Sequence, residues 1–435
     1  MSVTLIAVLA LMLFFTVLAI GVPIGIAMGG VGLLGIIALR GFDAALMSLF
    51  TIPYTSVASW SLSVIPMFLF MGYIGFYAGF TKDAYTAAYK WVGRLPGGVA
   101  IATLIGGAGF GACSGSSIAA TAALGRIAIP EMERFNYNQG LACGATAVAG
   151  TLAALIPPSI LLVLYGIITE QSIGKLLIAG IIPGLISMAC FAIYIYIRAF
   201  INPAFAPRGA AATFREKLSS FKEAAPLIFI FIVVVAGIYS GIFSPSEAGA
   251  LGALSMIVVS LIMRRLTWEK FRESIFETVR VTCSIFLIVL GAYIFIQFLA
   301  ISRLPINFAE WVVALPFHPL IILIGVLATY LVLGCFLDAL GLILLTVPFI
   351  FPAITSMGFN PIWFGIIVVK MVEIGLLTPP VGIQTYVLKG VVPHIPLNTI
   401  FMGIMPFFLV DLFIVIGLFI AFPEIVTFLP NQMGG

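Results

Sequence analysis

Apolar segments long enough to cross a membrane follow one another from the beginning of this chain to its end. A bilayer core of about 30 Å is crossed by about 20 apolar helical residues. The chain supplies such segments throughout, and only 8% of its 435 residues are charged, whereas soluble domains carry about a quarter. We find none of the short alternating segments typical of membrane barrels, so the sequence predicts an all-α polytopic membrane protein.

Lysine and arginine gather in three stretches that predict the orientation of the chain. These stretches are 82–94, 198–222 and 264–280, and basic loops of membrane proteins face the cytoplasm. Threading the spans from these anchors predicts about 11 transmembrane helices and two re-entrant hairpins, with both termini outside. The net charge of +4 lies mainly in loops, so it bears on topology and predicts no nucleic-acid partner.

Five identities recur at a fixed offset of 222 residues and indicate an internal repeat. The pairs are Cys113 with Cys335, Pro130 with Pro352, Asn138 with Asn360, and Pro157-Pro158 with Pro379-Pro380. Within a single integral membrane unit over 1–435, the expected parts are a first repeat over 62–222 with a hairpin near 97–131, connecting scaffold spans and a cytoplasmic loop over 223–279, and a second repeat over 280–435 with a hairpin near 318–357. The basic stretches place the two hairpins on opposite sides of the membrane. The repeats are therefore expected to be inverted, a construction typical of secondary transporters.

The first hairpin predicts a cation site. Its glycines and serines between 106 and 117 weaken a helix and expose carbonyls and hydroxyls, the hard oxygen ligands that a small cation such as sodium prefers. One span later, the missing amides of the first double proline free further carbonyls. We expect Ser114, Gly115 and Pro157 to hold sodium. The alternative is close packing of helices through small residues.

The second hairpin predicts a related site around one carboxylate. Asp338 lies in an apolar stretch, where a charge is costly unless it faces a cavity, a partner or an ion. With Gly334 of the same hairpin, and Gly375 and Thr378 beside the second double proline, it is expected to bind a second sodium ion. The alternative is that Asp338 caps free amides at the hairpin turn.

Other charged residues lie within the later spans and in the first hairpin. Lys370 and Glu373 are three residues apart in one span, so they are expected to share a helix face and neutralise each other. Asp411 has no evident partner in the sequence. Arg126, in the second arm of the first hairpin, is expected at the membrane interface.

Several motifs, taken in order, resemble the large membrane subunit of tripartite ATP-independent periplasmic (TRAP) transporters, the DctM type. The motifs are 65–72 (IPMFLFMG), 91–98 (WVGRLPGG), 111–117 (GACSGSS), 129–132 (IPEM), 155–159 (LIPPS), 243–248 (FSPSEA) and 378–382 (TPPVG). The resemblance runs over almost the whole chain. It implies an elevator mechanism, in which a transport domain with two hairpins and two broken helices moves against a scaffold and is driven by a sodium gradient.

The resemblance also implies a substrate site, which falls on Ser116, Ser117, Ser159 and Gln384. Two positions depart from the family pattern. Ala153 stands where the family often has glycine before the first double proline, and Gln384 stands where an asparagine commonly follows the second.

The family implies a bacterial inner-membrane setting, contact with membrane lipids and two protein partners. The partners are a small four-helix membrane subunit and a periplasmic substrate-binding protein, both expected as separate polypeptides. The substrate is expected to be a small organic anion, such as a dicarboxylate, keto acid or sugar acid. Sodium is the coupling ion, and no organic cofactor is expected.

Three other functions remain as alternatives. A self-sufficient ion-coupled carboxylate carrier has the same architecture and needs no binding protein. An intramembrane enzyme is disfavoured because the sequence offers no nucleophile, base and orienting group and no metal-ligand spacing. A channel is disfavoured because there is no ring of charges or repeated filter sequence.

Overall fold

The chain folds into helices, as its apolar pattern predicts. The computed structural model describes residues 2–433, with the backbone alone at 112–114. Every regular element in these residues is helical. Within these residues, seven helical stretches are long and apolar enough to cross a membrane: Trp60–Tyr77, Ile173–Ile201, Phe214–Tyr239, Pro245–Ile262, Trp268–Ser302, Ala339–Ser356 and Leu397–Ala421. The protein is therefore a multi-pass membrane protein.

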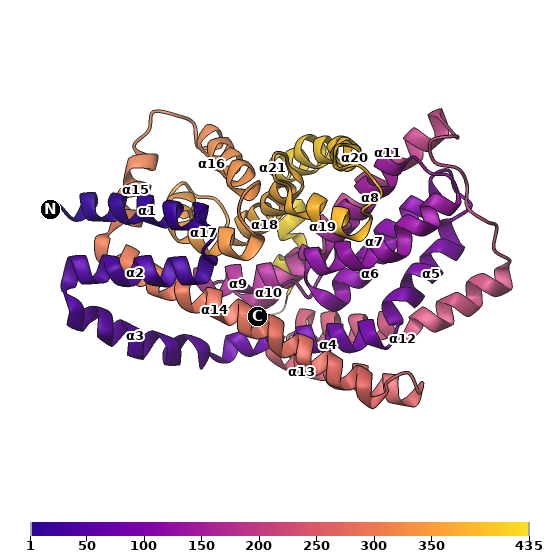
Figure 1. Cartoon of the computed structure of the whole chain (residues 1–435), viewed down its shortest axis with the longest axis horizontal. Coiled ribbons are helices and arrows are strands. Elements are labelled where there is room, and N and C mark those ends of the chain that lie inside the picture. The colour runs from indigo at the N-terminus through magenta and orange to yellow at the C-terminus, as the bar shows by residue number, and fades with distance from the viewer. Residues whose placement is uncertain (1, 434–435) are drawn as a thin grey trace.

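The first helices form an arm at one end of the molecule, beside one very long helix (Figure 1). The arm consists of α1 (Val3–Ala19), α2 (Ile24–Arg40) and α3 (Phe42–Val57), and the long helix is α14 (Trp268–Ser302). Helix α2 lies so close to α14 that a Cβ atom on Gly25 would stand 2.8 Å from the Cα of Ile288. Helix α3 carries Asp43 in its first turn and Pro53 in its interior.

A helical hairpin and a broken helix follow the arm. The elements are η1 (Trp60–Ser63), α4 (Val64–Tyr77), α5 (Phe80–Val92), α6 (Gly98–Ser114), α7 (Ser117–Arg134), α8 (Gln139–Thr151), η2 (Leu152–Ala154) and α9 (Ile160–Thr169). Gly97 (φ +70°) and Gly115 (φ +58°) adopt the left-handed conformation at the two ends of α6, where a side chain would be strained. The helix that begins with α8 stops at the double proline, and α9 continues after it.

The middle of the chain connects the two halves. It contains α10 (Ile173–Ala179), α11 (Ile181–Ile201), α12 (Phe214–Tyr239) and α13 (Pro245–Ile262). The segment between α11 and α12 folds onto the base of the first hairpin, where the Asn138 amide donates to the Phe205 carbonyl at 3.0 Å. The Gly209 amide also donates to the Gly93 carbonyl at 2.8 Å, so the basic stretches 82–94 and 198–222 meet at this base. The stretch 82–94, expected as a loop, is mostly the helix α5.

The second half repeats the order of hairpin and broken helix. Its elements are α15 (Leu304–Val313), α16 (Pro319–Gly334), α17 (Ala339–Ser356), α18 (Pro361–Leu377), α19 (Ile383–Val391), α20 (Leu397–Leu409), η3 (Val410–Val415), α21 (Ile416–Ala421) and α22 (Glu424–Gln432). The segment η3 is a π-helical turn that contains Asp411. Helices α16 and α17 form the second hairpin, and α18 breaks at the second double proline before α19.

The residues related by the 222-residue offset occupy equivalent places in the two halves. Asn138 and Asn360 cap the N-termini of the two broken helices, α8 and α18, with their side-chain oxygens. Pro130 and Pro352 lie within the second arms of the two hairpins. Both double prolines lie at the helix breaks, and both have a cis peptide bond. The side chain of Cys113 is outside the described residues.

Glycines allow the second hairpin to touch the second broken helix. A Cβ atom on Gly334 would lie 2.9 Å from the Gly375 Cα, whereas one on Gly325, in the same helix, would have no neighbour within 4 Å. Because backbone cannot yield like a side chain, Gly334→Ala is expected to destabilise the protein by about 1–3 kcal/mol. Gly325→Ala is the matched control and is expected to leave stability unchanged or slightly raised. Thermal unfolding of the purified variants measures both, and equal melting temperatures would contradict the close approach.

Candidate functional site

The tips of the two hairpins meet at one cavity of about 220 Å³, which we call the tip cavity. The first tip contributes Gly115, Ser116 and Ser117, and the second contributes Asp338. The beginning of α9 and one face of α14 complete the wall. Four of the residues predicted for ion or substrate binding, from segments more than 200 residues apart, are therefore brought together.

The first tip packs directly on the first helix break. A Cβ atom on Gly115 would stand 2.5 Å from the Pro158 carbonyl oxygen, so only glycine fits here. Ser116 caps α7 by accepting from the Ala119 amide, and Ser159 caps α9 by accepting from the Leu162 amide. The first turns of α7 and α9 thus face the tip cavity, and helix N-termini favour negative charge.

The second tip is organised by Asp338. Its Oδ2 atom accepts hydrogen bonds from the amides of Leu340 and Gly341, both at 3.1 Å. The structure therefore confirms the capping interpretation of this carboxylate. Its Oδ1 atom makes no hydrogen bond with a described residue, and Asp338 lines the tip cavity. One carboxylate oxygen thus shapes the turn while the other stays available to a ligand.

A cation from α14 completes the cavity. Arg280 lines it together with Ser284, four residues later on the same helix face. The Arg280 side chain is 79% exposed and lies 3.7 Å from Glu277, so its guanidinium remains accessible. Sequence analysis missed this role because Arg280 ends a basic stretch that was assigned to orientation. The only hint in the sequence is the Ser284 hydroxyl at helical spacing in the apolar run that follows.

A buried polar network lies behind the first tip. Ser117 donates to Glu373 Oε1 at 2.8 Å, and Gln384 donates to Glu373 Oε2 at 3.1 Å. The Thr121 hydroxyl donates to Gln384 Oε1 at 2.7 Å. Glu373 and Gln384 are completely buried. The network therefore joins α7 of the first hairpin to both sides of the second helix break.

Comparison with known proteins decides the family. Residues 11–425 match the family described as "Tripartite ATP-independent periplasmic transporter, DctM component". The chain belongs to the DctM family. It is a transport component and not an enzyme.

Two relatives cover most of this DctM chain. It is 33% identical to the sialic acid TRAP transporter large permease protein SiaM of Vibrio cholerae, over 87% of this chain and 88% of the relative. It is 35% identical to the C4-dicarboxylate TRAP transporter large permease protein DctM of Pseudomonas aeruginosa, over 86% of this chain and 87% of the relative. The crystal structure of the Alcanivorax borkumensis YdaH transporter has a similar fold, with a TM-score of 0.61 over 88% of this chain and 90% of the other, at 14% identity.

The remaining predicted residues of this DctM protein lie around the cavity and not in its wall. Ser159 is fully buried and donates to the Ala154 carbonyl, and Gln384 is held by Glu373 and Thr121. Pro157 belongs to the first break. Gly334 and Gly375 touch, and the Thr378 hydroxyl donates to the Ile374 carbonyl at 2.7 Å. The side chain of Ser114 lies outside the described residues.

The expected pairing of Lys370 with Glu373 is wrong. Lys370 instead forms a fully buried ion pair with Asp411, with 2.8 Å between Nζ and Oδ1. The geometry of this contact falls short of a hydrogen bond, and Asp411 Oδ2 also has no hydrogen-bond partner among the described residues. The π-helical turn that carries Asp411 lies far along the chain from α18, so helix periodicity could not reveal this partner. The ring of Phe191, 5.3 Å from Nζ, adds a cation–π contact.

Removing one member of this ion pair leaves an uncompensated charge inside the protein. Asp411→Asn is expected to destabilise the protein by about 3–5 kcal/mol. The double variant Lys370→Met, Asp411→Leu replaces both charges by apolar groups and is expected to be more stable than Asp411→Asn. Thermal unfolding in detergent compares the two variants with the unmodified protein. If Asp411→Asn were as stable as the unmodified protein, the pair would contribute nothing.

Proposed function

We propose that this DctM chain imports a small organic anion across the bacterial inner membrane, driven by an inward sodium gradient. The observation that carries the proposal is the tip cavity. Two hairpin tips, the first turns of α7 and α9, and Arg280 surround it. Polar tips and a cation around a small space between apolar helices suit a charged ligand that must be desolvated and released again.

The proposed substrate class is a carboxylate, such as a dicarboxylate, keto acid or sugar acid. Arg280 offers a planar donor that matches a carboxylate, and the helix N-termini add partial positive charge. The two relatives are described as carriers of sialic acid and of C4-dicarboxylates. We propose that Ser116 and Ser117 contact the substrate. Ser159 supports this site through its bonds to the backbone of the first break, and Gln384 supports it through the side chains of Thr121 and Glu373.

The proposed sodium sites lie on either side of this cavity. The first uses Ser114, Gly115 and Pro157, where the first tip packs on the first break. The second uses Gly334, Asp338, Gly375 and Thr378. The close fit of each tip to a break supports both sites: Cys335 of the second tip donates to the Pro379 carbonyl at 3.4 Å, as Gly115 meets the Pro158 carbonyl in the first half. Carbonyl, hydroxyl and carboxylate oxygens are suitable ligands for a hard cation.

We further propose inverted repeats that move as one transport domain in an elevator mechanism, with about 11 spans and both termini outside. Hairpins that enter from opposite sides meet tip to tip, which fits the arrangement at the tip cavity. The basic stretches 82–94 and 198–222 both lie at the base of the first hairpin, as expected for a cytoplasmic side. Met433 near the C-terminus lines a cavity with Ser244 and Pro245 in the turn between α12 and α13. One span separates this turn from each of the basic stretches 198–222 and 264–280, so the proposed topology places it outside.

The family description is that of one component of a tripartite periplasmic transporter. We propose that the other components are a small four-helix membrane subunit and a periplasmic substrate-binding protein. A self-sufficient carrier would not need the binding protein. Uptake measured with and without that protein discriminates between these two functions.

Uptake by the reconstituted complex is expected to require inward sodium and the binding protein, and not ATP. The complex is placed in proteoliposomes with sialic acid or succinate as the labelled probe, and one gradient is imposed at a time. Replacing external sodium by potassium should abolish uptake. Undiminished uptake in potassium would refute sodium coupling, and rapid uptake without the binding protein would favour the self-sufficient carrier.

Two substitutions separate the capping role of Asp338 from its proposed role as a sodium ligand. Asparagine is as good an N-cap as aspartate, so Asp338→Asn should keep the wild-type melting temperature. It removes the charge, and we expect the sodium concentration for half-maximal uptake to rise about tenfold or more, because charged ligands contribute most to cation binding. Asp338→Ala removes the N-cap as well as the charge, so it should in addition lower the free energy of unfolding by about 1 kcal/mol.

Sodium titration of uptake, together with thermal unfolding, measures both effects. If Asp338→Asn transported with unchanged sodium dependence, Asp338 would be a cap alone.

A further inference from the structure

A second cavity, of about 280 Å³, lies between α4 and the first hairpin. We call it the side cavity. Ser116 belongs to the walls of both the side cavity and the tip cavity. Tyr73 of α4 and Arg126 of α7 also line the side cavity. The two cavities therefore adjoin at the first hairpin tip, and the second one contains its own cation.

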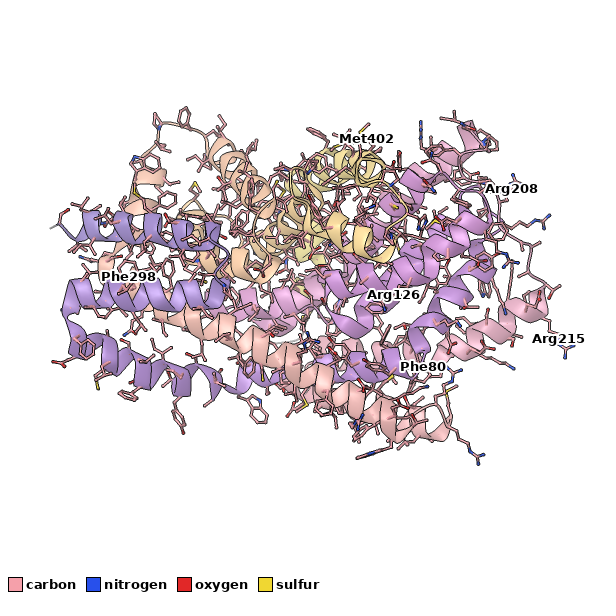
Figure 2. All side chains as sticks on the ribbon, viewed as in Figure 1. Phe80, Arg126, Arg208, Arg215, Phe298 and Met402 are labelled. Carbon is pink, nitrogen blue, oxygen red and sulfur yellow. The ribbon has the colours of Figure 1, made fainter. Side chains whose placement is uncertain are left out.

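Arg126 carries a positive charge within the first hairpin. It makes no ion pair or hydrogen bond with any described residue, although charges nearer the hairpin base are matched. Glu131 lies 3.6 Å from Arg134, and Glu133 lies 2.7 Å from His394. Figure 2 shows Arg126 near the middle of the molecule and away from Arg208 and Arg215 at its end.

The side cavity offers an open path for a ligand between Ser116 and Arg126. Arg126 lies ten positions after Ser116 along α7, which corresponds to about 15 Å along the helix axis. The α7 residues that face the side cavity between them are alanines, including Ala119 and Ala123, and α4 presents Gly72 opposite. Small side chains leave the space open. An unpaired arginine in a membrane protein is costly unless it faces water or a ligand.

We propose that Arg126 forms a second anion-binding site, which receives the carboxylate of the transported substrate after it leaves the tip cavity toward the base of the first hairpin. This inference rests on the proposed function, since it assumes that an organic anion occupies the tip cavity. In the proposed orientation the base is cytoplasmic, so the side cavity is a release route. A cation along that route lowers the barrier for an anion crossing apolar surroundings.

The experiment compares the two faces of the reconstituted complex. Labelled sialic acid and succinate are each tested, and the acid that the unmodified complex transports is used throughout. Proteoliposomes preloaded with this acid at several concentrations give the internal half-saturation concentration in exchange. Uptake with the binding protein gives the external half-saturation concentration. Arg126→Gln should raise the internal value about tenfold, as expected for loss of one charge-assisted hydrogen bond, and change the external value by less than about twofold.

Three further variants make the result specific. Arg126→Lys keeps the charge and should restore most of the internal affinity. Ala122→Glu places a carboxylate four residues before Arg126, where it neutralises the guanidinium within α7, and should reproduce the effect of Arg126→Gln with the arginine present. Arg134→Gln, in the same helix but exposed at the base, should leave both half-saturation values unchanged.

The tip cavity is tested separately by Arg280→Gln, which should raise the external half-saturation concentration. If Arg280→Gln had no effect, the proposed tip site would fail, whatever the result at Arg126. If Arg126→Gln and Ala122→Glu both kept the wild-type internal value, the second anion site would be refuted while the tip site stood. Equal rises of the internal and external values for Arg126→Gln would also refute it, because Arg126 would then belong to the first site.

Discussion

The structure depends on one constraint: a backbone within a membrane must find all its hydrogen-bond partners inside the protein. Two helices stop at double prolines within the protein, and each stop is covered by a hairpin tip. Gly115 fits against the Pro158 carbonyl at the first break, and Cys335 donates to the Pro379 carbonyl at the second. The irregular backbone is thus buried against protein and beside a cavity, which is where a membrane protein tolerates it.

The covered breaks are also the polar centre of the molecule. Because a new helix begins at each tip, Ser116 and Asp338 serve as N-caps there, and both residues line the tip cavity. In Asp338 the two carboxylate oxygens differ in role. Oδ2 caps α17 by accepting from two amides, and Oδ1 makes no hydrogen bond with a described residue. The same local chemistry that terminates the helices therefore supplies the oxygens for the proposed ion and substrate sites.

The two halves are not independent of each other. Glu373, beside the second break, accepts a hydrogen bond from Ser117 at the first tip and another from Gln384. Such a buried network rigidifies its members when it is satisfied. We infer that it holds the first hairpin and the second broken helix as one body, which is what an elevator-type movement of a transport domain requires. The Lys370–Asp411 pair ties the second broken helix to the last spans in the same way.

The sequence by itself determined the all-helical membrane fold, both hairpins and both helix breaks, because hydropathy, glycine and proline act through local physics. Its motifs, by resemblance, indicated the family. The 222-residue offset also found the equivalent caps Asn138 and Asn360. Only the tertiary structure decided which charges meet. Lys370 was assigned to its helical neighbour, yet it pairs with Asp411, and Arg280 was assigned to orientation, yet it lines the tip cavity. Spacing along one helix identifies neighbours on that helix alone, whereas the partner of a buried charge is set by the packing of helices distant in sequence.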